Sequence, residues 1–443
     1  MNITPHLRPL SAAFLAATLA LTALADSPVG WAWTGGVTAD TAVITARIET
    51  DAPAALRIIE TDTTVATTLA EPMANGALHR YPLGELKPDT AYTYAFIDAD
   101  GTPLDDELRT FRTFPKAGTP ASYRFAVASC AKGMNSPVFT AASHQGARFF
   151  LHTGDFHYHD IAENRVETFR SAFNAHLSQP RLRTLLAHMP LLYQWDDHDF
   201  GPNDSNRHSP SREASLLNYR QLVPHHPLDL AAGDPHGPVD QAFTVGRVRF
   251  ILSDLRSQRD PEARRMMNAA QDAWFRKELL AARDAGHPLI FWMSSVPWNG
   301  PANTYNDRWQ GYADHRREIA DFIKANNLAG RVVILSGDAH LTAIDDGANA
   351  DFATDGGAPI PVFQAGPIYN KGSYKGGPYN RGARYETPEG KMLTHFGLVD
   401  IEDDGAEIRV TFSGRDGTDG IGDTMLLSER DAEGPVEWSF TVR

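Results

Sequence analysis

The sequence predicts an α/β fold of layered sheets and helices, preceded by a small all-β sandwich. Residues 27–115 carry strand signals alone, whereas from residue 122 onward apolar strand candidates alternate with helical patterns. This alternation is typical of sheets covered by helices. The stretch 116–120 (Lys-Ala-Gly-Thr-Pro) has the composition of a linker. We therefore expect one domain at residues 27–115 and a second at residues 122–443.

The first 25 residues are predicted to be a signal peptide. His6 and Arg8 precede an apolar run from Leu10 to Ala25, which ends in the small-residue motif Ala-Leu-Ala. The run is shorter than the roughly 20 residues that a membrane-spanning helix needs, and no later segment approaches that length. We expect a periplasmic or secreted protein without a membrane span, cleaved near Ala25.

Residues 27–115 contain several short strand signals. Apolar residues alternate with other residues from Ala42 to Ile48, and again from Tyr92 to Phe96 after a turn at Pro88. A third run, Leu108 to Phe114, is ended by a proline. Strands at this spacing are typical of a sandwich of immunoglobulin or fibronectin type. No reactive cluster falls in this region, so we expect it to serve in packing and presentation.

The second region is predicted to alternate strands with helices. Two helices are predicted, at Asp272–Ala285 and Tyr312–Ala325. The stretches 201–240 and 345–389 are longer than ordinary connections and are expected to form walls of an active site. The strand candidates are Phe125–Ala128, Phe149–Leu151, Leu191–Tyr193, Val248–Leu252, Leu289–Met293, Val332–Leu335 and Val362–Phe363.

Composition narrows the classes of function. Apolar residues make up 42% of the 443 residues and charged residues 22%, which excludes global disorder. A formal charge of -14 argues against a basic surface for stable nucleic-acid binding. The 17 His and single Cys favour metal or acid–base chemistry. In an oxidising compartment the unpaired Cys130 would be a buried core residue, an intermolecular bridge or a metal ligand. We expect the protein to be a monomer.

Reactive side chains follow the predicted strands. The carboxyl ends of strands in α/β sheets gather at one edge, so these residues are expected to converge. A single Asp after a strand is commonplace, but Cys, Asp, Tyr and His after several strands are not. The residues are Ser129-Cys130, Gly154-Asp155-Phe156-His157-Tyr158, Trp195-Asp196-Asp197-His198-Asp199, Asp254-Leu255-Arg256 and Ser336-Gly337-Asp338-Ala339-His340.

These residue types suit a cluster of metal ions. Asp155 offers two carboxylate oxygens that can bridge two cations, and Tyr158 lies three residues further along. A thiolate, a phenolate and an imidazole together favour a redox-capable metal such as iron. Carboxylates favour calcium, magnesium or another divalent ion. Such a cluster activates water and holds phosphoryl oxygens.

The motifs resemble those of the alkaline phosphatase D (PhoD) family, metallophosphoesterases related to purple acid phosphatases. The resemblance rests on Gly154-Asp155-x-x-Tyr158, Trp195-Asp196-Asp197-His198-Asp199 and Ser336-Gly337-Asp338-x-His340, together with Ala128-Ser129-Cys130, Asp254-Leu255-Arg256 and Trp309-Gln310-Gly311-Tyr312. It implies a four-layered α/β/β/α sandwich after the small β-domain. It also implies an exported phosphatase that binds Fe³⁺ and one or two Ca²⁺.

The resemblance implies a role for each matched residue. The ferric ligands would be Cys130, Asp155, Tyr158 and His340, with Asp155 bridging, and Asp197 and Asp338 would hold the divalent ion. His198 would be the general acid. Asn203 or Asp204 would supply a further oxygen ligand, and Arg256 a phosphate contact.

We therefore expect hydrolysis of phosphate monoesters, diesters or both, on small or polymeric substrates. Two alternatives stay open: a phosphodiesterase or phospholipase specific for lipid, nucleotide or cell-wall diesters, and a non-catalytic phosphate-binding protein. Two other features receive plainer interpretations. Residues 371–382, rich in Lys, Tyr and Gly, are interpreted as a solvated loop rather than a flap over phosphate, and His225-His226 as a surface pair.

Overall fold

The computed structural model describes residues 27–50, 54–71, 77–382, 391–418, 420, 425–427 and 435–443. The signal peptide predicted for residues 1–25 lies outside the described residues. Among the helices that are described, none combines the length and the apolar character that a bilayer crossing requires.

The N-terminal region forms two small antiparallel sheets. The run predicted from Ala42 to Ile48 is strand β2, and the run from Tyr92 to Phe96 lies within β6. Buried side chains such as Ile44, Ile58 and Tyr94 fill the space between the sheets, so the predicted all-β fold of this region is confirmed. One sheet has the order β1 (Val29–Gly35), β2 (Ala42–Ile48), β5 (Leu78–Leu83), and the other β4 (Thr63–Leu69), β3 (Ala55–Glu60), β6 (Ala91–Ile97), β7 (Arg109–Arg112).

The rest of the chain builds two seven-stranded sheets. The first runs β10 (Leu191–Tyr193), β9 (Phe150–His152), β8 (Tyr123–Ala128), β18 (His395–Asp403), β19 (Ile408–Asp416), β20 (Met425–Leu426), with β21 (Glu437–Val442) also paired to β19. The second runs β11 (Gln241–Val245), β12 (Val248–Leu252), β13 (Leu289–Ser294), β14 (Val332–Ser336), β16 (Val362–Gln364), β15 (Ala343–Asp345), β17 (Arg381–Gly382).

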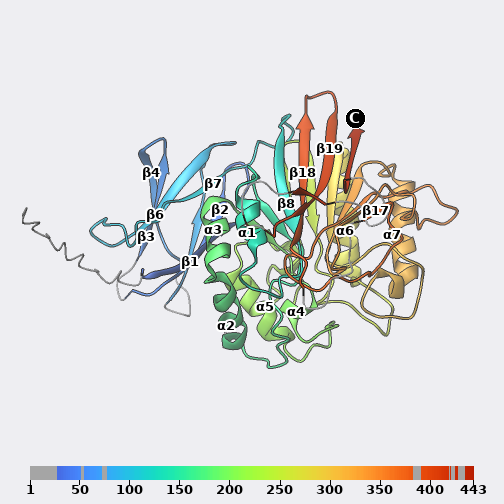
Figure 1. Ribbon diagram of the computed structural model, residues 1–443, viewed down its shortest axis with the longest axis horizontal. Coiled ribbons are helices and arrows are strands. Elements are labelled where there is room, and N and C mark those ends of the chain that lie inside the picture. The colour runs from blue at the N-terminus through green and yellow to red at the C-terminus, as the bar shows by residue number, and fades with distance from the viewer. Residues whose placement is uncertain are drawn as a thin grey trace, which may run out of the picture.

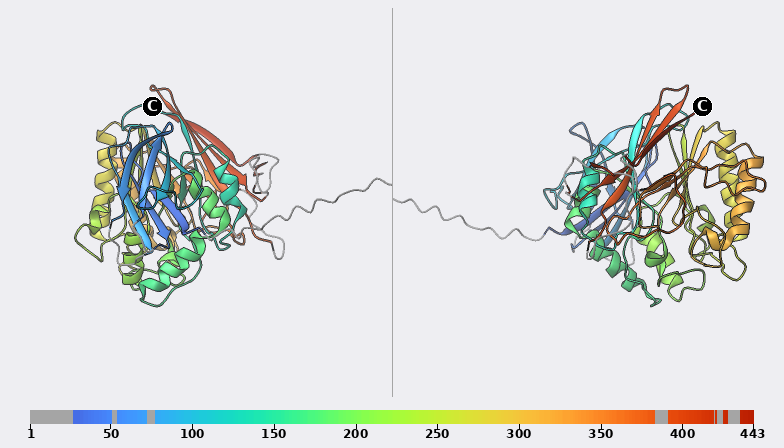
Figure 2. Two further views of the ribbon diagram at one scale, coloured as in Figure 1. Left: turned by 90° about the vertical axis from the view of Figure 1, so that its left-hand side faces the viewer. Right: turned by 45° about the vertical axis from the view of Figure 1, so that its right-hand side comes forward.

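The two large sheets pack face to face between two layers of helices, as Figures 1 and 2 show. Phe125 of the first sheet meets Phe250 and Phe291 of the second, with ring centroids 5.5 and 5.4 Å apart. Outside the second sheet, Phe275 of α6 packs on Trp292 at 4.6 Å. The predicted four-layered sandwich is therefore confirmed. The first sheet is covered by α1 (Pro137–Ser143), α2 (Val166–Leu177), α3 (Pro180–His188) and α5 (Arg212–Leu222), the second by α6 (Ala269–Asp284) and α7 (Ala313–Ala325).

Several expectations need correction. The helix expected from Asp272 begins at Ala269, because Asn268 caps it and accepts a hydrogen bond from the Gln271 amide at 2.9 Å. The long stretch 201–240, predicted to be rich in loops, also contains α5. His226 is no surface residue: its ring is buried, stacks on Phe243 at 4.3 Å and lies 2.8 Å from the Val37 carbonyl of the N-terminal region.

The strands that precede the reactive motifs are parallel. β8, β9 and β10 pair in parallel in one sheet, and β12, β13, β14 and β16 do so in the other. Their carboxyl ends therefore point to the same end of the sandwich. The short helix α4 (Asp197–Phe200) begins there directly after β10, and the 3₁₀ turn η2 (Trp309–Tyr312) leads into α7.

Candidate metal centre

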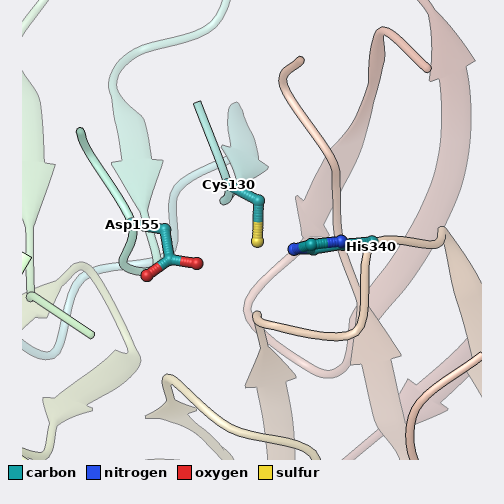
Figure 3. Close-up of side chains that lie close together, drawn as sticks. All are labelled: Cys130, Asp155 and His340. Atoms are coloured by element: carbon teal, nitrogen blue, oxygen red, sulfur yellow. The ribbon is translucent and has the colours of Figure 1, made fainter. Parts of the chain in front are cut away.

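Three residues from distant parts of the chain meet at the carboxyl ends of β8, β9 and β14. Figure 3 shows the Cys130 thiol, the Asp155 carboxyl and the His340 ring turned toward a common point. One ligand atom from each lies within 4.8 Å of the others, and Cys130 and Asp155 are buried. Since 209 positions separate the first from the last of these residues, this convergence is a product of the fold.

The backbone at these strand ends is held in an unusual conformation. Cys130, Asp155, Asp338 and His340 have φ angles of 63°, 59°, 60° and 52°. Residues other than glycine adopt this left-handed region at a cost of about 1–3 kcal/mol each, and they concentrate at functional sites. Next to them, a Cβ atom on Gly337 would lie 2.6 Å from the Thr153 carbonyl oxygen. At position 337 the backbone therefore passes too close to Thr153 for any residue larger than glycine.

Tyr158 joins this group. Its hydroxyl donates a hydrogen bond to Asp155 Oδ2 at 2.7 Å and lies 3.3 Å from His340 Nε2. Asn370 Nδ2 donates to the same hydroxyl at 2.9 Å and lies 3.2 Å from that ring nitrogen. The four residues for which the resemblance implied ferric ligation, Cys130, Asp155, Tyr158 and His340, are therefore neighbours.

Carboxylates also gather around Asp155. Its ligand atoms fall within 4.8 Å of Asp197 and His198 in one group and of Asp196 and Asp338 in another. Asp155 Oδ1, Asp196 Oδ2 and Asp338 Oδ2 are buried, and none has a hydrogen-bond partner in the described part of the chain. Buried carboxylate oxygens without partners are costly. Cations in this space would satisfy them, so the donor set fits metal ions.

Burial opposes ionisation of the same donors. It raises the pKa of the Cys130 thiol, the Asp155 carboxyl and the Tyr158 phenol, and the neighbouring negative groups add to the effect for Cys130 and Tyr158. Burial also lowers the pKa of His340 to about 4, which keeps the ring neutral and able to donate a lone pair. A cation would lower the pKa of the thiol, the carboxyl and the phenol, because it favours thiolate, carboxylate and phenolate. It would also bind the lone pair of the neutral His340 ring.

His198 lies at the rim of the cluster. Its ring packs at a tilt of 31° on Tyr158 with centroids 4.0 Å apart, and its Nδ1 lies 2.5 Å from Asp160 Oδ1. Burial alone would lower the pKa of His198, but Asp155, Asp197 and Asp160 together raise it to about 9. The ring is therefore held protonated by the surrounding carboxylates, as a proton donor needs to be.

Arg256 lies beneath the cluster and not in the open site. The side chain is fully buried, and its guanidinium contacts Asp196, Asp307 and Asp197 at 2.5, 2.5 and 3.4 Å. Burial would raise the pKa of Asp197, but Arg256 holds that pKa below its usual range. In this arrangement the guanidinium has no exposed face for the phosphate contact that the resemblance implied. It aligns the carboxylates instead.

Asn203 and Asp204, the two residues expected to supply a further oxygen ligand, are both exposed. Asp204 lies close to other acidic side chains. The ligand atoms of Asp204, Asp197 and Asp307 lie within 4.8 Å of one another, and the Asp204 amide donates to Asp197 Oδ2 at 2.7 Å. Sequence reasoning missed Asp307, although it lies two residues before the motif Trp309–Tyr312.

Two cationic side chains at the site were also missed. Lys375 Nζ donates to Asp338 Oδ1 at 2.5 Å, and Arg308 Nε lies 3.8 Å from Asp338 Oδ2. Lys375 belongs to the segment 371–382 that was interpreted as a solvated loop. That interpretation is wrong for this side chain, which turns into the acidic cluster. The many acidic residues that follow the strands were the available signal for these cations, because a buried cluster of carboxylates requires compensating positive charge.

Comparison with known proteins places these features in a family. A sequence model of the PhoD-like phosphatases matches residues 125–412. Alkaline phosphatase D of Bacillus subtilis (strain 168) is 27% identical over 328 residues, which span 62% of this chain and 55% of that protein. The family resemblance inferred from the strand-end motifs is thereby confirmed.

Two solved structures share the fold. A structure described as that of PhoD matches with a TM-score of 0.73 at 17% identity, over 94% of this chain and 90% of that one. Purple acid phosphatase PPD1 from yellow lupin (Lupinus luteus) seeds matches with a TM-score of 0.60 at 12% identity, over 93% of this chain and 73% of that one. Both matches extend beyond the region that the family model covers, so the fold agreement includes the N-terminal sheets.

Proposed function

Because the chain belongs to the PhoD-like phosphatase family, we propose that it is an exported, metal-dependent phosphoesterase acting on monoesters, diesters or both. The observation that carries the proposal is the convergence of Cys130, Asp155 and His340 with buried, unpartnered carboxylate oxygens. Export with cleavage near Ala25 rests on the N-terminal sequence pattern. The region 27–115 is proposed to be a separate, non-catalytic domain.

The chain's own donors would divide between two metal sites. Cys130, Tyr158 and His340 would hold Fe³⁺, Asp155 would bridge, and Asp197 and Asp338 would hold a divalent ion such as Ca²⁺. The bound ions would supply positive charge for the phosphoryl oxygens and activate water for attack. The neighbours of Asp155 support its bridging role, because its ligand atoms belong both to the group with Cys130 and His340 and to the group with Asp196 and Asp338.

His198 is the proposed general acid. A departing alkoxide needs a proton, and the Asp160 carboxylate, which is not among the proposed metal ligands, favours the protonated form of the His198 ring. The Asp160 carboxylate lies 2.5 Å from Nδ1 and thereby orients the ring. A positioned acid contributes about 10²–10⁴ to a rate.

The test compares a monoester and a diester of 4-nitrophenol. The metal-loaded protein is expected to hydrolyse at least one of them, and the rate ratio distinguishes a phosphatase from a phosphodiesterase. Removing the metals by chelation should abolish hydrolysis, and Fe³⁺ and Ca²⁺ should restore it. Asp338→Asn should resist restoration, whereas Asp314→Asn, an exposed site on α7, should behave as the wild type.

Two results would count against the proposal. Full activity in a rigorously metal-free preparation would exclude the metal-dependent reaction. Tight phosphate binding without turnover of either ester under any metal would instead favour a non-catalytic phosphate-binding protein.

A further inference from the structure

Two cations from separate loops meet at one carboxylate of the site. Lys375 Nζ lies 2.5 Å from Asp338 Oδ1, and Arg308 Nε lies 3.8 Å from Oδ2 of the same group. The Asp338 side chain is 4% exposed, whereas those of Lys375 and Arg308 are 28% and 21% exposed. The carboxylate is therefore enclosed, and the two cations lie on the side that solvent and a substrate can reach.

The loop of Lys375 is fixed to the site at both ends. The Ser373 amide donates to the His340 carbonyl at 3.3 Å, and the Ser373 hydroxyl donates to the Ala339 carbonyl at 2.9 Å. Further along, Asn299 Nδ2 donates to the Pro378 carbonyl at 3.0 Å. The position of the ammonium group is thus set by contacts with the strand-end segment that carries His340.

Arg308 is placed by a different set of contacts. Its guanidinium lies over the Tyr305 ring at 4.8 Å. Its Nε is buried and faces Asp338 Oδ2 at 3.8 Å and Asp307 Oδ2 at 4.0 Å. The side chain is still 21% exposed, and guanidinium donors match the geometry of phosphate oxygens.

We propose that Lys375 and Arg308 bind the phosphoryl oxygens of the substrate and so select its anionic group. The proposal rests on the phosphoesterase function proposed above and identifies the recognition residues of that site. Arg256 does not compete for this role, because its fully buried guanidinium is paired with three carboxylates.

The ion pair of Lys375 with Asp338 leads to a second consequence. A divalent cation held by Asp338 and the ammonium group of Lys375 compete for the same carboxylate charge. Removing the ammonium should therefore tighten cation binding while it weakens phosphate binding. A residue with only a structural role would move both affinities in the same direction.

The experiment measures both affinities by titration calorimetry on Lys375→Met and Arg308→Met. Inorganic phosphate, added to the metal-loaded protein, should bind about 10–100 times more weakly to each variant. Ca²⁺, added to the chelator-treated protein, should bind more tightly to Lys375→Met. In steady-state assays the loss should appear mainly in KM. Lys371→Met, which alters an exposed lysine on the same loop, and Arg317→Met, which alters an exposed arginine of α7, are the matched controls.

If Lys375→Met unfolds at a lower temperature than the wild type does, Lys375→Gln, which keeps a polar side chain, is titrated in its place. Phosphate affinity within twofold of wild type in folded variants of both positions would overturn this inference and leave the phosphoesterase function standing. A wild-type protein that binds no phosphate and hydrolyses no ester would overturn both.

Discussion

Arg256 and Asp196 form an ion pair that is closed to solvent, with Nε 2.5 Å from Oδ1 and side chains 0% and 1% exposed. The same guanidinium contacts Asp197 and Asp307. Arg256→Met leaves these carboxylates buried without compensation, which costs about 3–5 kcal/mol of unfolding free energy. Urea denaturation of the chelator-treated variant measures this loss. Adding Ca²⁺ should recover part of it, because a cation replaces the missing charge.

The exposed pair of Arg317 with Asp314 provides the control. Its side chains are 50% and 78% exposed, so Arg317→Met should change the unfolding free energy by less than about 1 kcal/mol. If Arg256→Met proves equally harmless, the guanidinium is not what holds the carboxylates together.

Tyr158 and Cys130 are predicted to determine the transition-metal content. A phenolate or thiolate on Fe³⁺ absorbs visible light, so the purified metal-loaded protein is expected to be coloured. Tyr158→Phe should lose or strongly shift this absorption, and Cys130→Ala should contain far less iron by elemental analysis. Tyr312→Phe, whose hydroxyl bonds to the Asn306 carbonyl, is the control and should keep both colour and iron. An unchanged spectrum in Tyr158→Phe would exclude the phenol as a ligand.

Metal removal is predicted to lower thermal stability through Asp155 and its neighbours. A cation present at about 100 times its dissociation constant stabilises the folded state by about 2.7 kcal/mol. For a chain of 443 residues the corresponding shift in unfolding temperature is about 3 °C. Differential scanning calorimetry with and without chelator measures it. Asp155→Asn should show a much smaller response to chelator, and a response equal to that of the wild type would place the stabilising ion elsewhere.

The sequence was sufficient to predict the layers and most of the site because strong local signals marked both. Buried strands such as Leu191–Tyr193 were recognised as apolar runs, and the reactive residues follow directly after them. Strand β18 was missed, although it pairs with β8 in the centre of the first sheet. Its sequence mixes Gly397 and Asp400 with apolar residues, so burial here depends on a partner strand far away in the chain.

The site residues that were missed have the same explanation. Asp307, Arg308 and Lys375 lie in loops, where no periodicity marks a residue as functional. Their roles come from charge pairing with Arg256 and Asp338, which only the folded arrangement reveals. The phosphate contact expected of Arg256 was implied by the resemblance of Asp254-Leu255-Arg256 to a family motif. Sequence position alone could not show that this side chain points down into the carboxylates.

Acid is predicted to destabilise the protein at His226, whose buried ring contacts the Val37 carbonyl of the N-terminal region. Burial lowers the pKa of this ring to about 4 from the usual 6.5. The unfolded chain therefore binds the proton first as pH falls, so the stability contributed by His226 is present above pH 6.5 and is lost between pH 6.5 and 4. His226→Gln should reduce the slope of unfolding free energy against pH in that window by about 1.4 kcal/mol per pH unit. The exposed His208→Gln is the control and should leave the slope unchanged.

The loss of hydrolysis rate on replacing His198 is predicted to be larger for a leaving group that needs a proton than for one that departs without it. Nitrophenolate departs without protonation, whereas an alkoxide does not, so His198→Asn should slow hydrolysis of an alkyl phosphate by about 10²–10⁴. The same variant should slow hydrolysis of 4-nitrophenyl phosphate far less. Asp160→Asn, which removes the carboxylate 2.5 Å from Nδ1, should show the same selectivity at smaller size. Equal losses on both substrates would assign His198 to binding of the phosphoryl group and not to protonation of the departing oxygen.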